Sequence, residues 1–108
     1  MRISVTEVGR TFGRQTRAYA EYRVFSSIAR FGDVARDVEV SLTSRLARAS
    51  AECVVTVIVR GDASVTVSAR GCHAYDAINR ASERTADALR RHSDPSWAAA
   101  RHGGSIDR

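Results

Sequence analysis

The chain has 108 residues and a formal net charge of +5, and all 17 of its basic residues are arginine. A chain of this length forms one domain that buries roughly 65% of its unfolded surface, which excludes a second hydrophobic core. The positive charge favours a polyanionic partner such as RNA. A soluble basic protein without such a partner has the same composition, so net charge alone leaves both interpretations open.

Two features of the sequence bear on the compartment. The longest apolar run covers only residues 54–59, too few to span a bilayer, and the N-terminus lacks the apolar run of a signal peptide. Cys53 and Cys72 are the only cysteines, and neither belongs to a Cys-x-x-Cys pair or a His-rich cluster. We therefore expect a reduced, cytoplasmic protein with no membrane partner, no metal and no cofactor.

The N-terminal third predicts a short strand, a polar loop between two glycines, and a helix. Ile3 and Val5 alternate with polar residues, as in a strand with one buried face. Residues 14–31 have a helical period and a wide apolar arc. One stripe of this arc is Ala18, Tyr22, Phe25 and Ala29, and the stripe beside it is Ala20, Val24, Ile28 and Phe31. Gly32 suits the left-handed position that follows many helices.

Three strands are predicted next. Residues 37–43 alternate, with Val38, Val40 and Leu42 on one side. Residues 53–59 are apolar on both faces and rich in β-branched side chains, which predicts a central strand. Residues 60–63 predict a hairpin turn into a strand with a polar outer face. The intervening residues 44–52 are expected to form a mobile connection or a helical turn.

The last helix is expected to have a packing face and a basic face. At about 100° per residue, the packing face contains Tyr75, Ile78, Thr85 and Leu89. The nearly opposite side carries Arg80, Arg84 and Arg91, with His73 on the same meridian, and one flank carries Asp76, Glu83 and Asp87. The periodicity ends at residues 93–95, where Pro95 forbids continuation. Residues 93–108 are expected to be a flexible tail, with Trp97 docked on its own domain.

This order of elements predicts the fold class. A strand, a helix, three strands and a helix indicate an α+β fold: a single βαβββα domain over residues 1–92, with a four-stranded mixed sheet and two helices packed on one face. On that face the basic row of the first helix, Arg23 and Arg30, is expected to lie beside the row on the last helix. The two rows would then form one cationic surface.

Several motifs in the two helices resemble one family. The last helix contains Ala74-Tyr-Asp-Ala-Ile-Asn79, then Arg84, and ends in Leu89-Arg-Arg-His92. This pattern is similar to the closing helix of the hibernation-promoting factor and ribosome-associated inhibitor family, also called the sigma-54 modulation protein family. Further similarity lies in residues 18–23, 28–31 and 69–71, so the resemblance covers roughly residues 2–92. It implies the same βαβββα fold, and the early end of the chain implies a short member without the family's C-terminal domain.

The resemblance also implies a function. Family members lie in the channel of the small ribosomal subunit at the subunit interface and block translation during stress by occlusion, without catalysis. The implied partners are the ribosome and its 30S rRNA, with no small-molecule substrate and a monomer off the ribosome. The implied rRNA-binding residues here are Arg23, Arg30, Arg80, Arg84, Arg90 and Arg91, with Tyr19 as a candidate for stacking on a base.

The sequence departs from the family pattern at three places. Asp87 occupies a position where the family usually has a basic residue, which should weaken phosphate contact there, and Arg80 is a candidate to compensate. Cys72-His73 replaces an acidic residue before the helix, and Asn79 replaces the Asp of the Tyr-Ala-Ala-Ile-Asp motif. These departures affect the expected strength of binding more than its place.

The sequence leaves one main alternative function open. A general module for structured RNA, with a fold similar to the double-stranded RNA-binding domain, is the main alternative, because the sequence does not separate the two. An enzyme is disfavoured, since the chain has no Gly-rich phosphate loop, paired-His metal motif or serine elbow. A protein adaptor that uses the polar outer sheet face has no positive feature in its favour.

Overall fold

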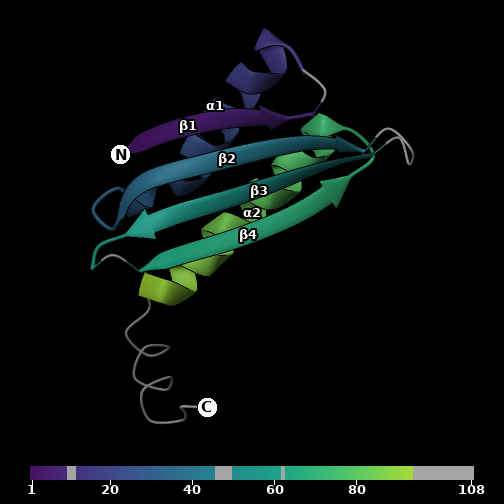
Figure 1. The fold of residues 1–108 in the computed structure, drawn as a ribbon. Coiled ribbons are helices and arrows are strands. Elements are labelled where there is room, and N and C mark those ends of the chain that lie inside the picture. Colours follow the sequence, from purple (N-terminus) through teal and green to yellow (C-terminus); the bar gives the residue numbers. More distant parts are fainter. Residues whose placement is uncertain (10–11, 46–49, 62, 94–108) are drawn as a thin grey trace.

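The computed structural model describes residues 1–9, 12–45, 50–61 and 63–93. The elements, in chain order, are β1 (Arg2–Val8), α1 (Arg14–Ile28), the short 3-10 helix η1 (Ala29–Phe31), β2 (Ala35–Arg45), β3 (Ser50–Val59), β4 (Ser64–Gly71) and α2 (Ala74–Ser93). Figure 1 shows one twisted sheet with both helices on the same face. The predicted α+β, βαβββα architecture is confirmed.

The sheet has the strand order β1-β2-β3-β4. β1 pairs with β2 in parallel, because α1 carries the chain back between them, whereas β2, β3 and β4 pair antiparallel. Val40 of β2 lies opposite Val5 on one side and Val55 on the other. Such rows of β-branched side chains form the floor on which the helices pack.

The core lies between the sheet and the helices. Val38, Val40 and Leu42 of β2 are buried, as predicted, and every second residue of β3 from Ala51 to Val59 is buried as well. Cys53 is one of these residues, and burial raises the pKa of its thiol to about 12. The Cys53 thiol is therefore protonated and unreactive at neutral pH, whereas Cys72 is exposed.

The connections between strands agree with the prediction in one place and differ in another. In the β3–β4 hairpin the Val59 N–H donates to the Ala63 carbonyl at 2.9 Å, and Gly61 has a φ of 87°, a conformation that favours glycine. The predicted connection over residues 44–52 is wrong in its length. The β2–β3 ladder continues to the pair Arg45 and Ser50, since the backbone groups there are still opposite one another. Residues 46–49 lie outside the described part of the chain.

The two helices match their predicted packing faces to different degrees. In α2, Ile78, Thr85 and Leu89 are fully buried, as predicted, but Tyr75 is 39% exposed. In α1, the stripe containing Val24 and Ile28 is buried, whereas the stripe of Ala18, Tyr22, Phe25 and Ala29 is exposed. The prediction of a wide buried arc on α1 is therefore wrong. The buried positions of α1 repeat every four residues, from Thr16 to Ile28, so only one narrow face of α1 meets the core.

The end of α1 also differs from the prediction. Gly32 has φ −60° and ψ −23°, so it is right-handed and not left-handed. The chain leaves α1 through the 3-10 turn of η1, in which the Gly32 N–H donates to the Ala29 carbonyl at 3.1 Å. This turn satisfies a carbonyl at the helix end, so no left-handed residue is needed.

α2 ends at Ser93, close to the predicted position. The predicted tail, including Trp97, falls on residues 94–108 and lies outside the described residues. In the described part of the chain, neither helix combines the length and apolar character needed to cross a bilayer.

Candidate nucleic-acid interface

A cluster of polar and aromatic side chains joins α1 to α2. The Tyr19 hydroxyl donates to Asn79 Oδ1 at 2.6 Å, and Arg23 Nε donates to the same oxygen at 3.1 Å. The rings of Tyr19 and Tyr75 lie 4.7 Å apart at a tilt of 57°. We call Tyr19, Arg23, Tyr75 and Asn79 the interhelical cluster. Tyr19, the candidate for base stacking, thus has its ring and hydroxyl in contact with α2.

Arg23 and Arg30 lie at different places along the first helical segment. Arg23 also donates to Ser27 Oγ, and its Nη2 lies 3.8 Å from Glu83 Oε2 of α2, so its guanidinium contacts side chains of both helices. Arg30 is exposed, and its guanidinium lies 5.1 Å from the ring centre of Phe31. This cation–π contact leaves the N–H donors at the edge of the guanidinium free to bind an anion.

Arg80, Arg84 and Arg91 lie on the side of α2 that faces the edge strand β4. Arg84 Nη1 donates to the Ser68 carbonyl of β4 at 2.8 Å. Arg80 lies one turn earlier, where it pairs with Asp76 at 3.1 Å. Arg91 is exposed and, seven residues after Arg84, lies within about 20° of it around the helix. Arg90 pairs with Asp87 at 2.9 Å.

The two basic rows are therefore separated from one another. Around α2, Arg84 is about 140° from Asn79, the residue that contacts Arg23. Asp76, Glu83 and Asp87 fall between them, at about 40° to 80° from Asn79, and we call these three residues the acidic ridge. The two predicted rows do not form one continuous cationic surface, because the carboxylates of the acidic ridge lie between them: Glu83 lies 3.8 Å from Arg23, and Asp76 lies 3.1 Å from Arg80.

The start of α2 is held by side chains that the sequence did not single out for this role. The Cys72 N–H donates to Asp76 Oδ2 at 3.1 Å, and the Asp76 N–H donates to His73 Nδ1 at 3.2 Å. The hydrogen bond from Cys72 and the pairing with Arg80 lower the pKa of the Asp76 carboxyl from its usual 3.8. Gly71 is required here, because a Cβ at this position would lie 2.6 Å from the Ala77 nitrogen.

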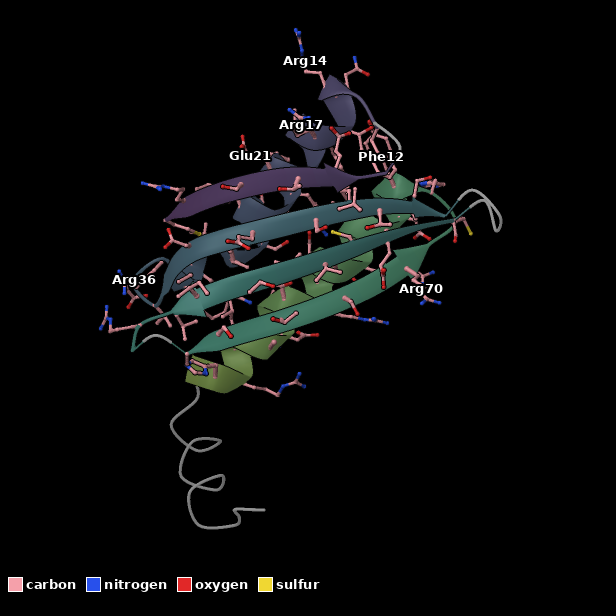
Figure 2. All side chains as sticks on the ribbon, viewed as in Figure 1. Phe12, Arg14, Arg17, Glu21, Arg36 and Arg70 are labelled. Carbon is pink, nitrogen blue, oxygen red and sulfur yellow. The ribbon has the colours of Figure 1, made fainter. Side chains whose placement is uncertain are left out.

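A hollow lies beside this basic row, between β4 and α2. Its lining residues are Glu52, Ser68, Ala69, Arg70, Arg80 and Arg84. Figure 2 shows Arg70 projecting from the end of β4. Sequence analysis did not select Arg70, although its place beside the inward-pointing Ala69 in an alternating strand indicates an outward-pointing cation. We call this feature the sheet-edge hollow.

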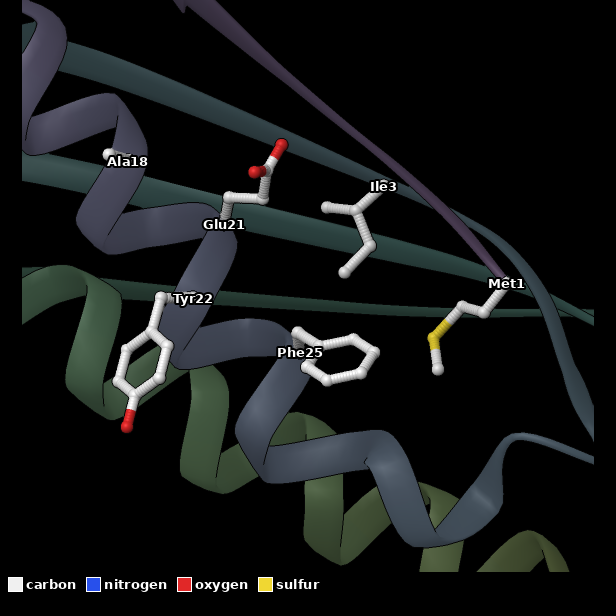
Figure 3. A pocket seen from close by; sticks show the side chains of 6 residues that line it. All are labelled: Met1, Ile3, Ala18, Glu21, Tyr22 and Phe25. Atoms are coloured by element: carbon white, nitrogen blue, oxygen red, sulfur yellow. The ribbon is translucent and has the colours of Figure 1, made fainter.

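A second hollow, between α1 and the start of β1, is more apolar. It is lined by Met1, Ile3, Ala18, Glu21, Tyr22 and Phe25. Figure 3 shows Phe25 directed toward Met1 and Ile3, with Tyr22 directed away from them. This hollow contains the exposed stripe of α1, with Tyr22 67% and Phe25 49% exposed. Its six lining residues include the carboxylate of Glu21 and no basic side chain, in contrast to the sheet-edge hollow.

Among the described residues, no group of three His, Cys, Asp or Glu side chains is placed to hold a metal ion. The candidate site is therefore a set of exposed guanidinium groups at the sheet edge and along α2. Guanidinium groups bind phosphate through paired N–H donors and carry little base preference, so this arrangement is suited to a nucleic-acid backbone.

The family model for the sigma 54 modulation protein / S30EA ribosomal protein family matches residues 3–95. The chain belongs to this family. The match includes every described element except the first residue of β1.

Solved structures show the same fold. The crystal structure of the Thermus thermophilus Protein Y N-terminal domain has 22% identity to this chain and a TM-score of 0.72, over 85% of this chain and 99% of that one. A ribosomal subunit interface protein from Coxiella burnetii has 12% identity and a TM-score of 0.75, over 85% of this chain and 97% of that one. No protein of curated function matches the sequence.

Proposed function

We propose that this protein is a ribosome hibernation or stress factor that binds the small-subunit rRNA channel at the subunit interface and blocks translation by occupying it. The observation that carries the proposal is the family match over residues 3–95, because the description of that family includes the S30EA ribosomal protein. The name of the Coxiella relative, a ribosomal subunit interface protein, supports the same location. The protein would act in the cytoplasm, as a monomer off the ribosome and without catalysis.

In this proposal, arginine side chains bind the phosphates of the rRNA. Arg30, Arg80, Arg84 and Arg91 are exposed, and Arg90 is exposed beside Asp87. Arg23 is half-buried between the helices, so its part in binding would be to position α1 as well as to reach a phosphate. If six to ten phosphates are neutralised, affinity should fall by about 10³ to 10⁵ between 50 and 200 mM salt.

Co-sedimentation tests the proposal. Purified protein is pelleted with 70S ribosomes and with separated 30S and 50S subunits, at two salt concentrations and with excess duplex RNA as competitor. We expect salt-sensitive pelleting with 70S and 30S that duplex RNA does not displace. Equal displacement by duplex RNA would favour a general module for structured RNA. Absence of pelleting at low salt would contradict ribosome binding.

A further inference from the structure

The sheet-edge hollow brings together three cations from two elements far apart in the sequence. Arg70 projects from β4, whereas Arg80 and Arg84 lie one helical turn apart on α2. Residues four apart on a helix are neighbours, so the two helix cations face the hollow together. Arg70 of β4 is the third cation that lines the hollow. None of the contacts considered for the proposed function includes Arg70.

Each of these guanidinium groups is oriented by the protein without being saturated. Arg84 Nη1 donates to the Ser68 carbonyl, and Arg80 Nε donates to Asp76 Oδ1. Arg70 Nε lies 3.8 Å from Glu52 Oε2. A guanidinium carries five N–H donors, so one contact leaves several donors for a ligand. The side chains of Arg70 and Arg80 are each 58% exposed, which keeps those donors accessible.

The charge of the hollow selects the kind of ligand. Three arginines against the two carboxylates of Glu52 and Asp76 leave a net positive charge. The lining has a single apolar side chain, that of Ala69, so the hollow offers little to an apolar ligand. Planar guanidinium groups match the oxygens of a phosphate and bind it through two parallel hydrogen bonds.

We propose that the sheet-edge hollow binds a phosphate group of an RNA backbone, and that Arg70 is one of the residues that contact it. The inference rests on the proposed function and extends it, because the RNA would run over β4 and α2 and not only over the two helices. A free phosphate compound would present the same chemistry, so the tests below separate the two sources. Glu83 and Asp87 of the acidic ridge limit the RNA path on the side of α2 that is turned away from β4, because they repel phosphate.

The first test is the salt dependence of ribosome binding by Arg70→Gln. Loss of one phosphate contact should reduce the slope of log affinity against log salt by about 1, and should weaken binding by about eightfold at 0.1 M salt. The matched control is Arg14→Gln, which removes one charge at the start of α1, well away from Arg70 in Figure 2. Equal slopes for Arg70→Gln and the wild type, with both proteins folded, would overturn the proposal.

The second test does not use ribosomes. The side-chain Nε–H signals of arginine are followed by NMR during titration with a short RNA and, separately, with pyrophosphate, and each signal is assigned by its loss in an Arg→Gln variant. We expect RNA to shift the Arg70, Arg80 and Arg84 signals more than the Arg14 signal. Shifts caused by pyrophosphate and not by RNA would overturn the RNA assignment, and no shift with either would overturn the site.

The two proposals fail in different ways. Wild-type protein that does not pellet with ribosomes would contradict the proposed function, and the NMR titration would still decide whether the hollow binds RNA phosphate. Wild-type protein that pellets, with Arg70→Gln pelleting at the same salt slope, would leave ribosome binding intact and remove Arg70 from the interface.

Discussion

The interhelical cluster and the sheet-edge hollow both contain arginine, but their arginines differ in how many protein groups they contact. In the interhelical cluster Arg23 has three protein partners, namely Asn79, Ser27 and Glu83. Among the described residues, each arginine of the hollow contacts one group, namely the Ser68 carbonyl for Arg84, Glu52 for Arg70 and Asp76 for Arg80, and each remains exposed. A half-buried network of this kind stabilises the fold, whereas exposed donors beside a hollow are available to a ligand. The position of an arginine on a helix therefore does not by itself assign it to a binding surface.

The largest effect is expected from charge reversal at the sheet edge. Arg84→Glu combined with Arg91→Glu should weaken ribosome binding by about a hundredfold or more, because two phosphate contacts are lost and two like charges are added. Both positions are exposed, so the thermal melt should change little. Sedimentation and melting curves check this outcome.

A control for that double variant has the same change in net charge. Arg2→Glu with Arg14→Glu places two new carboxylates on exposed positions away from α2. Binding of this control should fall much less. A sheet-edge variant that still binds at the wild-type level, or that unfolds, would contradict the prediction.

A substitution in the interhelical cluster should lower the free energy of unfolding. Asn79→Ala removes the oxygen that accepts from both Tyr19 and Arg23, and should reduce the free energy of unfolding by about 1–3 kcal/mol. Chemical denaturation measures this change. Asn79→Asp is the matched control, since a carboxylate accepts the same two hydrogen bonds, and its stability should be close to that of the wild type. A loss of ribosome affinity in Asn79→Ala with unchanged stability would mean that the cluster is a binding site.

A smaller effect is expected at Asp76, which borders the hollow. Asp76→Asn keeps an acceptor for the Cys72 N–H but removes the negative charge beside Arg80, so ribosome affinity should rise by about fivefold. Glu39→Gln, on an exposed strand position, is the control for loss of one carboxylate. If both variants gain affinity equally, the effect reflects net charge and not the hollow.

Asp76 should also make the stability of the fold depend on pH. The folded-state pKa of Asp76 is lowered from 3.8, so its charged form adds stability at neutral pH, and that stability is lost as the pH falls through the folded pKa. Asp76→Asn has no such titration. The difference in melting temperature between wild type and variant should therefore be constant near pH 7 and shrink below about pH 4. A difference that stays constant to lower pH would show that the Asp76 charge does not stabilise the fold.

The smallest effect is expected on the exposed stripe of α1. Tyr22→Ser should change the free energy of unfolding by no more than about 0.5 kcal/mol, because the side chain is 67% exposed. Ile28→Ala on the buried face of the same helix should cost about 2–5 kcal/mol. Denaturation of the two variants compares the two faces directly, and equal losses would mean that the apolar hollow beside β1 is a second core contact.

The elements that could be predicted are those with a clear local period. β2 and β4 alternate and α2 has its apolar residues on one side, so the buried face of each can be predicted from its own residues. β3 is apolar on both faces, so its residues predict a central strand but not which face is buried. α1 differs, because its apolar residues lie around most of its circumference, and Tyr22 and Val24 are equally suited to a core by composition. The family motifs could also be read from the sequence, since they depend on order and spacing alone.

The candidate site was predicted only in part, for a related reason. All six arginines chosen from the sequence lie on the helical side, but their grouping depends on how α2 is rotated against β4 and α1. That rotation is set by Ile78, Ala81 and Leu89 in the core, which place Asn79 toward α1 and Arg84 toward β4. Arg70 was missed because a single cation at the end of a strand has no pattern of its own.

The sequence by itself determined the order of the strands and helices, the buried faces of β2 and α2, and membership of the family, because alternation, helical period and motif spacing are properties of neighbouring residues. Only the tertiary structure decided which side of α1 is buried, that the acidic ridge separates the two basic rows, and that Arg70 joins Arg80 and Arg84. These features depend on contacts between residues far apart in the chain, and such contacts exist only after the helices have packed on the sheet.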